Sequence, residues 1–263
     1  MGKKVISIFL LLLFTVNLRS EDNEEASGKS SADIYEQVSS LYEKRDYGSI
    51  LKALAFAEEK KDDWIKNPEY LALLSLIYSH AVYRNWHEGT NRDELLKKAE
   101  TFANKALKLG KEEYFGYKAM GNIYLLKGDR TKALEMFQKA TDINQNDAEL
   151  WYFYACASNG KITDRYSLAG QRIIRTLEVD PLFIWAKEDL IMAFIIENKI
   201  NKAEAITKDL IKNNPSYPHI PYFEAVILLR KGQKKEAKEK FDQFIKLNPG
   251  IRLIEILKEK MYD

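Results

Sequence analysis

The chain has 263 residues, of which 41 are Lys or Arg and 39 are Asp or Glu, so its formal net charge at pH 7 is +2. This length can bury a hydrophobic core without disulfides, and the single cysteine, Cys156, excludes an internal disulfide framework. Basic residues alternate with acidic ones, as in Lys234, Lys235 and Glu236, which argues against a nucleic-acid-binding face.

The first 20 residues are organised like a secretory signal peptide. The basic stretch Met1 to Lys4 precedes an apolar run of 12 residues, Val5 to Val16, and Ser20 is an acceptable small residue before a cut. An uncleaved anchor is the alternative, but a bilayer-spanning helix needs about 20 apolar residues. Residues 1–20 therefore predict export, to the periplasm or out of the cell, with membrane contact only through an uncleaved signal.

The next segment, residues 21–31, is acidic and Ser-rich with little apolar content, so we expect a disordered leader. Removal of residues 1–20 takes away Lys3, Lys4 and Arg19 and no acidic residue, which changes the net charge from +2 to −1. The exported protein would be close to neutral, which again gives no reason to expect nucleic acid as a partner.

Beyond the leader, small residues recur at a fixed step. Five alanines follow one another at intervals of 34, 36, 34 and 34 residues: Ala99, Ala133, Ala169, Ala203 and Ala237. Pro181, Pro215 and Pro249 keep the same step. A small residue at fixed spacing marks a close approach of two helices, and a proline that closes each unit marks where the second helix stops. The chain is therefore predicted to be a tandem array of helix pairs.

The first two units are degenerate. Residues 31–64 and 68–113 carry apolar residues at helical spacing, namely Val38, Leu41, Ile50, Leu54 and Ala57 in the first and Leu71, Leu74, Tyr78, Ala99, Ala103 and Ala106 in the second. The linker around Asn85 to Arg92 is long and turn-rich, so the second unit is predicted to carry an insertion near His87. Insertions in such arrays collect on one edge, which makes this loop a candidate contact site.

The third unit, residues 114–147, shows the pattern most clearly. Helical spacing places four residues on one face and three on the next: Tyr117, Met120, Gly121, Tyr124, then Ala133, Phe137 and Ala140. Between the two faces, Gly128 is free to take a positive φ and Asp129 can cap the second helix. One unit is therefore a helix, a tight turn and a helix.

This order of residues resembles the tetratricopeptide repeat, whose pattern of aromatic, apolar, glycine, tyrosine, alanine and aromatic residues spans about 34 residues. Gln145 stands where the closing proline would be. The resemblance covers residues 31–262 and implies an all-α solenoid of about six antiparallel helix pairs in a right-handed superhelix. It also implies a non-enzymatic protein that binds a protein or peptide.

Three further units are predicted over residues 148–183, 184–217 and 218–251, and a capping helix over 251–262 would cover the open end of the array. The step of 36 reflects two extra residues near Ile162 and Thr163. In the fifth unit Ile191 replaces the small residue and Thr207 replaces the aromatic one, so a looser or rotated helix contact is predicted there.

Residues with catalytic potential are sparse. His80, His87 and His219 fall in different units and show no metal-ligand spacing, so neither a metal site nor a cofactor is predicted. No phosphate loop or nucleophile motif is visible, and Cys156 in its apolar helix is interpreted as a small buried hydrophobe. The chain is therefore predicted not to be an enzyme.

The resemblance implies that the first helices line a concave groove. The positions of the first helices that lie between the packing positions are mostly aromatic and apolar, which favours a partner with an apolar stripe. The predicted groove residues are Phe115, Lys118, Asn122, Tyr152, Asn159, Trp185, Glu188, Met192, Tyr222, Val226 and Leu229. Packing on neighbouring helices is the alternative reading for each of them.

A subset of the family grips a partner's C-terminal carboxylates with basic and amide side chains on successive first helices. Lys118 and Asn122 resemble its opening pair, but Glu188 at a later position would repel a carboxylate. We therefore predict that the chain is not a carboxylate clamp.

The function predicted from sequence is an adaptor or scaffold that binds a partner polypeptide in a concave, largely apolar groove, in the cell envelope or outside the cell. A chaperone-like holder of unfolded or translocating chains is one alternative. An accessory subunit of a glycan or cell-wall enzyme is another, in which Trp185 and Tyr222 would stack on sugars. The convex face and the loop near His87 are alternative contact sites.

Overall fold

The computed structural model describes residues 31–44, 46–59, 66–83 and 91–247. Within these ranges the regular structure is entirely α-helical, and no strand is present. Twelve helices follow one another as six pairs: α2 (Ser31–Glu43) with α3 (Tyr47–Glu59), α5 (Pro68–Tyr83) with α6 (Arg92–Leu109), α7 (Tyr114–Leu126) with α8 (Arg130–Ile143), α9 (Ala148–Ala157) with α10 (Leu168–Val179), α11 (Ile184–Ile196) with α12 (Ile200–Asn213), and α13 (Ile220–Arg230) with α14 (Lys234–Leu247).

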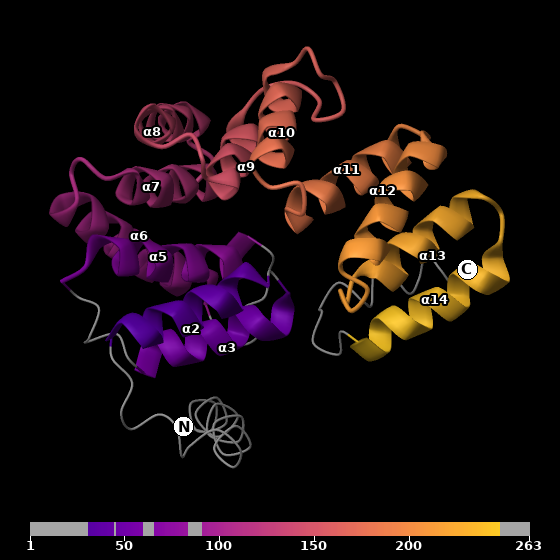
Figure 1. Ribbon diagram of the computed structural model, residues 1–263, viewed down its shortest axis with the longest axis horizontal. Helices are drawn as coiled ribbons and strands as arrows, with labels where there is room; N and C mark the ends of the chain where they lie inside the picture. The colour runs from indigo at the N-terminus through magenta and orange to yellow at the C-terminus, as the bar shows by residue number, and fades with distance from the viewer. Residues whose placement is uncertain (1–30, 45, 60–65, 84–90, 248–263) are drawn as a thin grey trace.

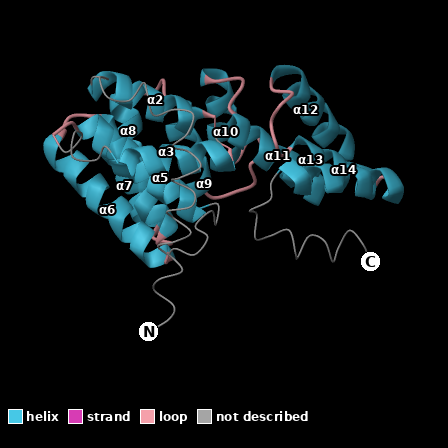
Figure 2. Cartoon of the chain, turned by 90° about the horizontal axis from the view of Figure 1, so that it is seen from below, coloured by secondary structure: helices cyan, strands magenta, loops and turns pink. Residues whose placement is uncertain are grey.

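The pairs follow one another along an arch from α2 to α14 (Figure 1). Seen from below, α11–α14 extend away from α2–α10 along the long axis of the molecule (Figure 2). None of the helices in the described ranges is long and apolar enough to cross a membrane. The array is therefore an all-α helical-repeat solenoid, as the repeat pattern predicts.

Local sequence explains where the helices begin and turn. The predicted turn between α7 and α8 is confirmed, since Gly128 has φ of 81° and the Asp129 carboxylate accepts a hydrogen bond from the Lys132 N–H at 3.1 Å. Asp147 caps α9 in the same way, through the Leu150 N–H at 2.9 Å. These side chains satisfy amide groups that the first helical turn leaves without intrahelical partners.

The recurring small residues lie where the helices of a pair meet. All five recurring alanines are buried. A Cβ atom added to Gly121 on α7 would lie 2.5 Å from the Phe137 ring of α8, so this pair tolerates only glycine beside that ring.

In the fifth pair the large and the small residue of this helix contact are exchanged between the two helices. At the corresponding positions α11 carries Ile191 and α12 carries Thr207, and both side chains are buried. The Thr207 hydroxyl donates to the Ala203 carbonyl at 2.9 Å, so its polar atom needs no partner on α11. The fifth pair therefore has a large residue on its first helix and a small one on its second, the reverse of Gly121 and Phe137 in the third pair.

A continuous hydrophobic core runs from α2 to α13, and Trp185 at the start of α11 is its largest fully buried side chain. Its ring stacks on His80 of α5 at a centroid distance of 4.0 Å and lies edge-on to Tyr42 of α2 at 6.1 Å. It also contacts Tyr152 and Phe153 of α9. Trp185 therefore fixes the last two pairs to helices more than a hundred residues earlier.

Several predicted segments lie outside the described residues and stay predictions. These are the signal peptide at 1–20, the leader at 21–31 apart from Ser31, the part of the insertion around His87, and the capping helix at 251–262.

Candidate functional site

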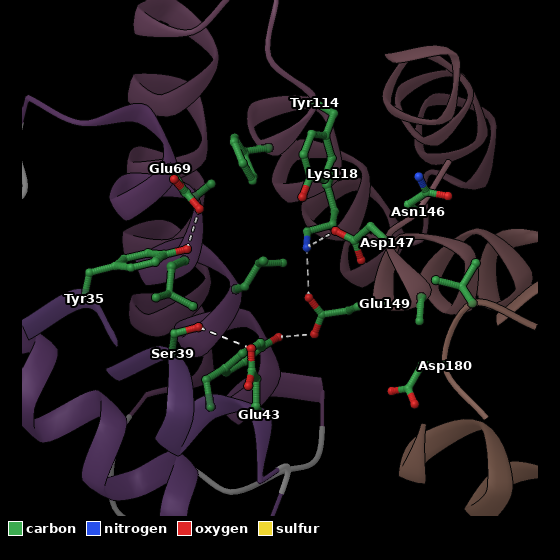
Figure 3. A pocket seen from close by; sticks show the side chains of 17 residues that line it. Tyr35, Ser39, Glu43, Glu69, Tyr114, Lys118, Asn146, Asp147, Glu149 and Asp180 are labelled. Atoms are coloured by element: carbon green, nitrogen blue, oxygen red, sulfur yellow. Dashed lines mark hydrogen bonds and ion pairs between the residues drawn. The ribbon is translucent and has the colours of Figure 1, made fainter. Parts of the chain in front are cut away.

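A cleft of about 380 Å³ opens between the first helices of four successive pairs, α2, α5, α7 and α9, and the segment that follows α10 (Figure 3). Its lining combines carboxylates and tyrosines: Glu43, Glu69, Asp147, Glu149 and Asp180 with Tyr35, Tyr42 and Tyr114. Lys118 is the one basic residue among the described residues that line it. The cleft thus gathers polar groups from five places in the sequence.

Lys118 holds one wall of the cleft together. Its ammonium donates to Asp147 Oδ2 at 2.7 Å and to Glu149 Oε2 at 3.1 Å, and all three side chains are largely buried. Burial lowers the pKa of Lys118, but the charges of Asp147 and Glu149 outweigh it, so that this pKa lies above its usual value. Burial likewise raises the pKa of Asp147, yet Lys118 holds it below the usual range.

A tyrosine extends this polar cluster to the first helix pair. The Tyr42 hydroxyl of α2 donates to Glu149 Oε1 at 2.6 Å, across 107 residues of sequence. Glu149 therefore accepts from α2 through one oxygen and from α7 through the other, while its own backbone belongs to α9. Three helices are tied together at one carboxylate.

The opposite wall carries Tyr35 and Glu69. The Tyr35 hydroxyl donates to Glu69 Oε1 at 2.6 Å, and its ring stacks on Tyr70 with centroids 4.5 Å apart. Burial, together with the neighbouring carboxylate, raises the pKa of Tyr35, and burial raises the pKa of Tyr114 to about 12. Both phenols therefore stay protonated at neutral pH and present hydroxyl donors to the cleft.

The cleft has an acidic excess. Five carboxylates line it against one ammonium, and that ammonium is engaged by Asp147 and Glu149. Glu69 accepts from the neutral Tyr35 hydroxyl, and Asp180 accepts from the Leu182 N–H at 2.8 Å. Neither Glu69 nor Asp180 forms an ion pair within the part of the chain that the structure describes, so at neutral pH the cleft carries a net negative charge.

The structure changes the interpretation of the predicted groove. Three of its polar members reach to the following helix pair instead of facing a partner. Lys118 bonds to Asp147 and Glu149, the Tyr152 hydroxyl donates to Asp189 Oδ2 at 2.7 Å, and Glu188 Oε1 lies 2.7 Å from His219 Nδ1. Each tie joins one first helix to the next first helix or to the residue that precedes it, and the side chains are buried between them.

Two further groove predictions are wrong because the side chains are interior. Trp185 has no exposed surface and fills the core between α5 and α9, which also removes it as a sugar-stacking residue. Asn122 is buried, and its amide donates to the Ser79 hydroxyl of α5 at 2.8 Å. Since both Lys118 and Asn122 are bonded within the chain, neither is offered to the carboxylate of a partner in this structure.

The remaining predicted residues do not form one surface. Phe115 is half-buried and lines the cleft. The four half-buried apolar residues lie on α11 and α13, outside the cleft: Met192, Tyr222, Val226 and Leu229. Asn159 is exposed in the loop after α9, and Cys156, interpreted as buried, is half-buried. This cleft is lined mainly by acids and tyrosines, and the largely apolar groove along the array stays a prediction.

Sequence reasoning missed Tyr35, Tyr42, Glu69 and Asp180. Tyr35 and Glu69 are separated by 34 residues, the repeat length, and this was the one periodic signal for their pairing. No periodic signal in the sequence places Tyr42 or Asp180 at the cleft, since their positions there depend on how far the array curves. Within the described residues, no group of three or more His, Cys, Asp or Glu side chains is placed to hold a metal ion.

Comparisons with known proteins identify the fold. Residues 224–250 match the family model of the tetratricopeptide repeat, and no curated protein sequence matches the chain. The structure of yeast Tom70 is similar with a TM-score of 0.50 and 22% identity, over 85% of this chain and 46% of that one. A tetratricopeptide repeat protein from Parabacteroides merdae reaches a TM-score of 0.46 at 18% identity, over 88% and 90% of the two chains. YrrB, described as a TPR protein with an unusual peptide-binding site, reaches 0.43 at 21% identity, over 82% and 100%.

Proposed function

Starting from a chain of tetratricopeptide-repeat fold, a fold of protein-interaction scaffolds, we propose that this protein is a non-enzymatic module that binds a segment of a partner polypeptide. The binding site is the cleft between α2, α5, α7 and α9. The observation that carries this proposal is the convergence of side chains from four successive first helices and from Asp180 on one hollow. Arrays of this kind bind along the surface that neighbouring repeats create together.

The lining of the cleft suits a polypeptide. Tyrosine rings supply apolar area, and their hydroxyls, the carboxylates and Asn146 supply partners for the amide groups of a peptide backbone. A volume of about 380 Å³ is at the small end of ligand pockets, so the cleft accepts one or two side chains and their backbone. The rest of the partner segment would lie along the outer parts of the array.

A pair of neighbouring serines gives a matched test. Ser39 of α2 lines the cleft, whereas Ser40, next to it on the same helix, is exposed and does not. Ser39→Trp should fill the cleft, and Ser40→Trp adds the same side chain outside it. In pull-downs from the native organism, we expect a partner that is retained by the unchanged chain and by Ser40→Trp and lost with Ser39→Trp. Partners retained equally by all three would place the contact elsewhere.

We also propose that the module acts after export, in the periplasm or outside the cell. The support is the organisation of residues 1–20, which has the features of a signal peptide. Cell fractionation with N-terminal sequencing of the accumulated protein tests this. A cytoplasmic protein that retains residues 1–20 would contradict it.

A second candidate function is a holder of apolar segments. A hollow of about 370 Å³ lies over α10, α11 and α12 and is lined mainly by apolar residues, including Leu177, Pro181, Leu190 and Ile206. Such a surface would bind many unfolded chains weakly, whereas a dedicated adaptor binds one partner. Suppression of the aggregation of several unrelated unfolded proteins, undiminished by Ser39→Trp, would favour this candidate over the adaptor.

A further inference from the structure

We infer that the partner segment in this cleft carries basic side chains, which are bound by the carboxylate of Glu69 on one wall or of Asp180 on the other and by the faces of the surrounding tyrosines. This inference rests on the proposed function and names the chemical class of the partner. In Figure 3, Tyr35 and Glu69 line one side of the cleft and Asp180 lies on the opposite side, with Lys118 and its two carboxylates between them.

Charge is the first argument. The cleft gathers five carboxylates and one ammonium, and the hydrogen bonds of Glu69 and Asp180 come from a phenol and a backbone amide, which are both neutral. A carboxylate in a confined site is stabilised far more by a cation than by a neutral donor. The cleft therefore has an unmet preference for positive charge at Glu69 and Asp180.

The chain's own lysine is the second argument. The Lys118 ammonium binds two carboxylates and lies 5.8 Å from the centroid of the Tyr114 ring, within the range of a cation–π interaction. This lining of carboxylates and tyrosines thus already binds one ammonium group. Tyr35 and Glu69 repeat the combination of aromatic ring and carboxylate on the other wall.

Other partner classes fit less well. An acidic segment would bring a further negative charge beside Glu69 and Asp180, and like charges brought together are unfavourable. An apolar segment would remove water from Glu69 and Asp180 without replacing it. A lysine or arginine side chain supplies the missing cation to Glu69 on one wall or to Asp180 on the other, and lays its aliphatic part on the tyrosine rings.

An unbiased selection tests the class of partner. The full chain is used to select from a library of displayed random peptides, with Ser39→Trp as a counter-selection that removes peptides bound outside the cleft. We expect the retained peptides to share a lysine or arginine at a recurring position. Retained peptides that share acidic or purely apolar positions would overturn the inference and leave the proposed function standing. If no peptide distinguished the full chain from Ser39→Trp, the proposed function would fail as well.

Charge-neutralising variants test the residues. Glu69→Gln with Asp180→Asn keeps the shape and the hydrogen-bond acceptors but removes two negative charges. The control, Glu112→Gln with Glu239→Gln, removes two charges from exposed residues outside the cleft. For a selected arginine peptide, we expect an affinity loss of roughly ten-fold or more in the cleft variant and little change in the control. Equal losses in the two variants would overturn the assignment to Glu69 and Asp180.

A neutral isostere separates charge from shape. Citrulline has nearly the shape of arginine without its charge, so its substitution into the selected peptide should weaken binding to the full chain by a similar factor. It should have little further effect on binding to the Glu69→Gln, Asp180→Asn variant. Equal affinities of the arginine and citrulline peptides for the full chain would show that the side chain is bound for its shape, and the inference would be wrong.

Discussion

The first four helix pairs and the last two are built on one repeat, yet only the first four enclose the acidic cleft. Around the cleft in α2–α10, buried polar ties join helices far apart in sequence, as Tyr42 and Glu149 do. In α11–α14 the largely buried tie of Glu188 to His219 joins neighbouring pairs, and other ion pairs are partly exposed, such as Lys231 with Glu204 at 2.6 Å and Lys240 with Glu224 at 2.7 Å. The repeating residues determine how the two helices of a pair pack. The residues next to them on the first helices determine whether neighbouring pairs form a binding cleft.

The two regions meet at Trp185. Its indole belongs to α11 but lies among Tyr42, His80 and Phe153 of the first region, and Tyr42 also lines the cleft. The floor of the candidate site is thus packed against a residue of the second region.

The largest effect is expected from removing this joint. Trp185→Ala should destabilise the protein by about 3–5 kcal/mol, because it leaves a large cavity between the regions. Hydrogen exchange should rise in α5 and α9 as well as in α11. The control is Phe241→Ala, which empties a buried position of the second region and should deprotect α13 and α14 only. Increased exchange confined to α11 and α12 in Trp185→Ala would show that the regions are not joined there.

The second largest effect is expected from Lys118→Met, which should lower the free energy of unfolding by about 3 kcal/mol, because it leaves Asp147 and Glu149 buried without their cation. The matched change in the second region, Lys240→Met, removes one partner of a more exposed pair and should cost less than about 1 kcal/mol. Urea denaturation of the two variants measures the difference. Equal losses would mean that the buried cluster is no more important to stability than a surface pair.

A pH dependence should distinguish the regions in the same way. The folded-state pKa of Asp147 lies below its ordinary value, so its ionised form stabilises the fold fully above the ordinary pKa of 3.8, and this stabilisation is lost as the pH falls through the folded-state pKa. Asp147→Asn should cost about 2 kcal/mol at pH 7, through the charge-assisted bond to Lys118. Its deficit relative to the unchanged chain should shrink below about pH 4, as urea midpoints at successive pH values would show. A deficit independent of pH would refute the role given to this charge.

The smallest effect is expected at the reversed packing pair. Thr207→Phe should destabilise the fifth pair by about 1–2 kcal/mol, since it puts a large ring opposite Ile191. Combining it with Ile191→Ala should recover part of the loss, because the pair would then resemble Gly121 and Phe137. A double-mutant cycle on thermal unfolding measures the coupling, and strict additivity would show that the two positions do not share one interface.

Much of the fold could be predicted from sequence, because pair packing is local. The alanine period, the Gly128 turn and the Asp129 cap depend on residues within one unit, and the structure has each of them. The reversed sizes of Ile191 and Thr207 are visible in the sequence, but the sequence does not decide that both side chains are buried, as they are in the structure. A pattern written for each position separately does not represent a compensation between two helices.

The candidate site was predicted poorly, for a different physical reason. Taking the residues between the packing positions of each first helix correctly selected Lys118 and Phe115, which line the cleft. The same rule also selected Trp185 and Asn122, which lie in the interior. The rule assumes that every first helix shows the same face to solvent. In the structure, several of these faces turn toward the next helix pair, as the Tyr152 tie to Asp189 shows.

The sequence by itself determined the helices, their pairing and the repeat, because helical periodicity, caps and small contact residues act over a few tens of residues. Only the tertiary structure decided which side chains meet across the array. Tyr42 reaches Glu149, Asp180 comes to face the cleft, and Trp185 fills the core because small rotations between successive pairs accumulate into one curvature. That curvature depends on every interface at once, so no single unit of the sequence specifies the acidic cleft.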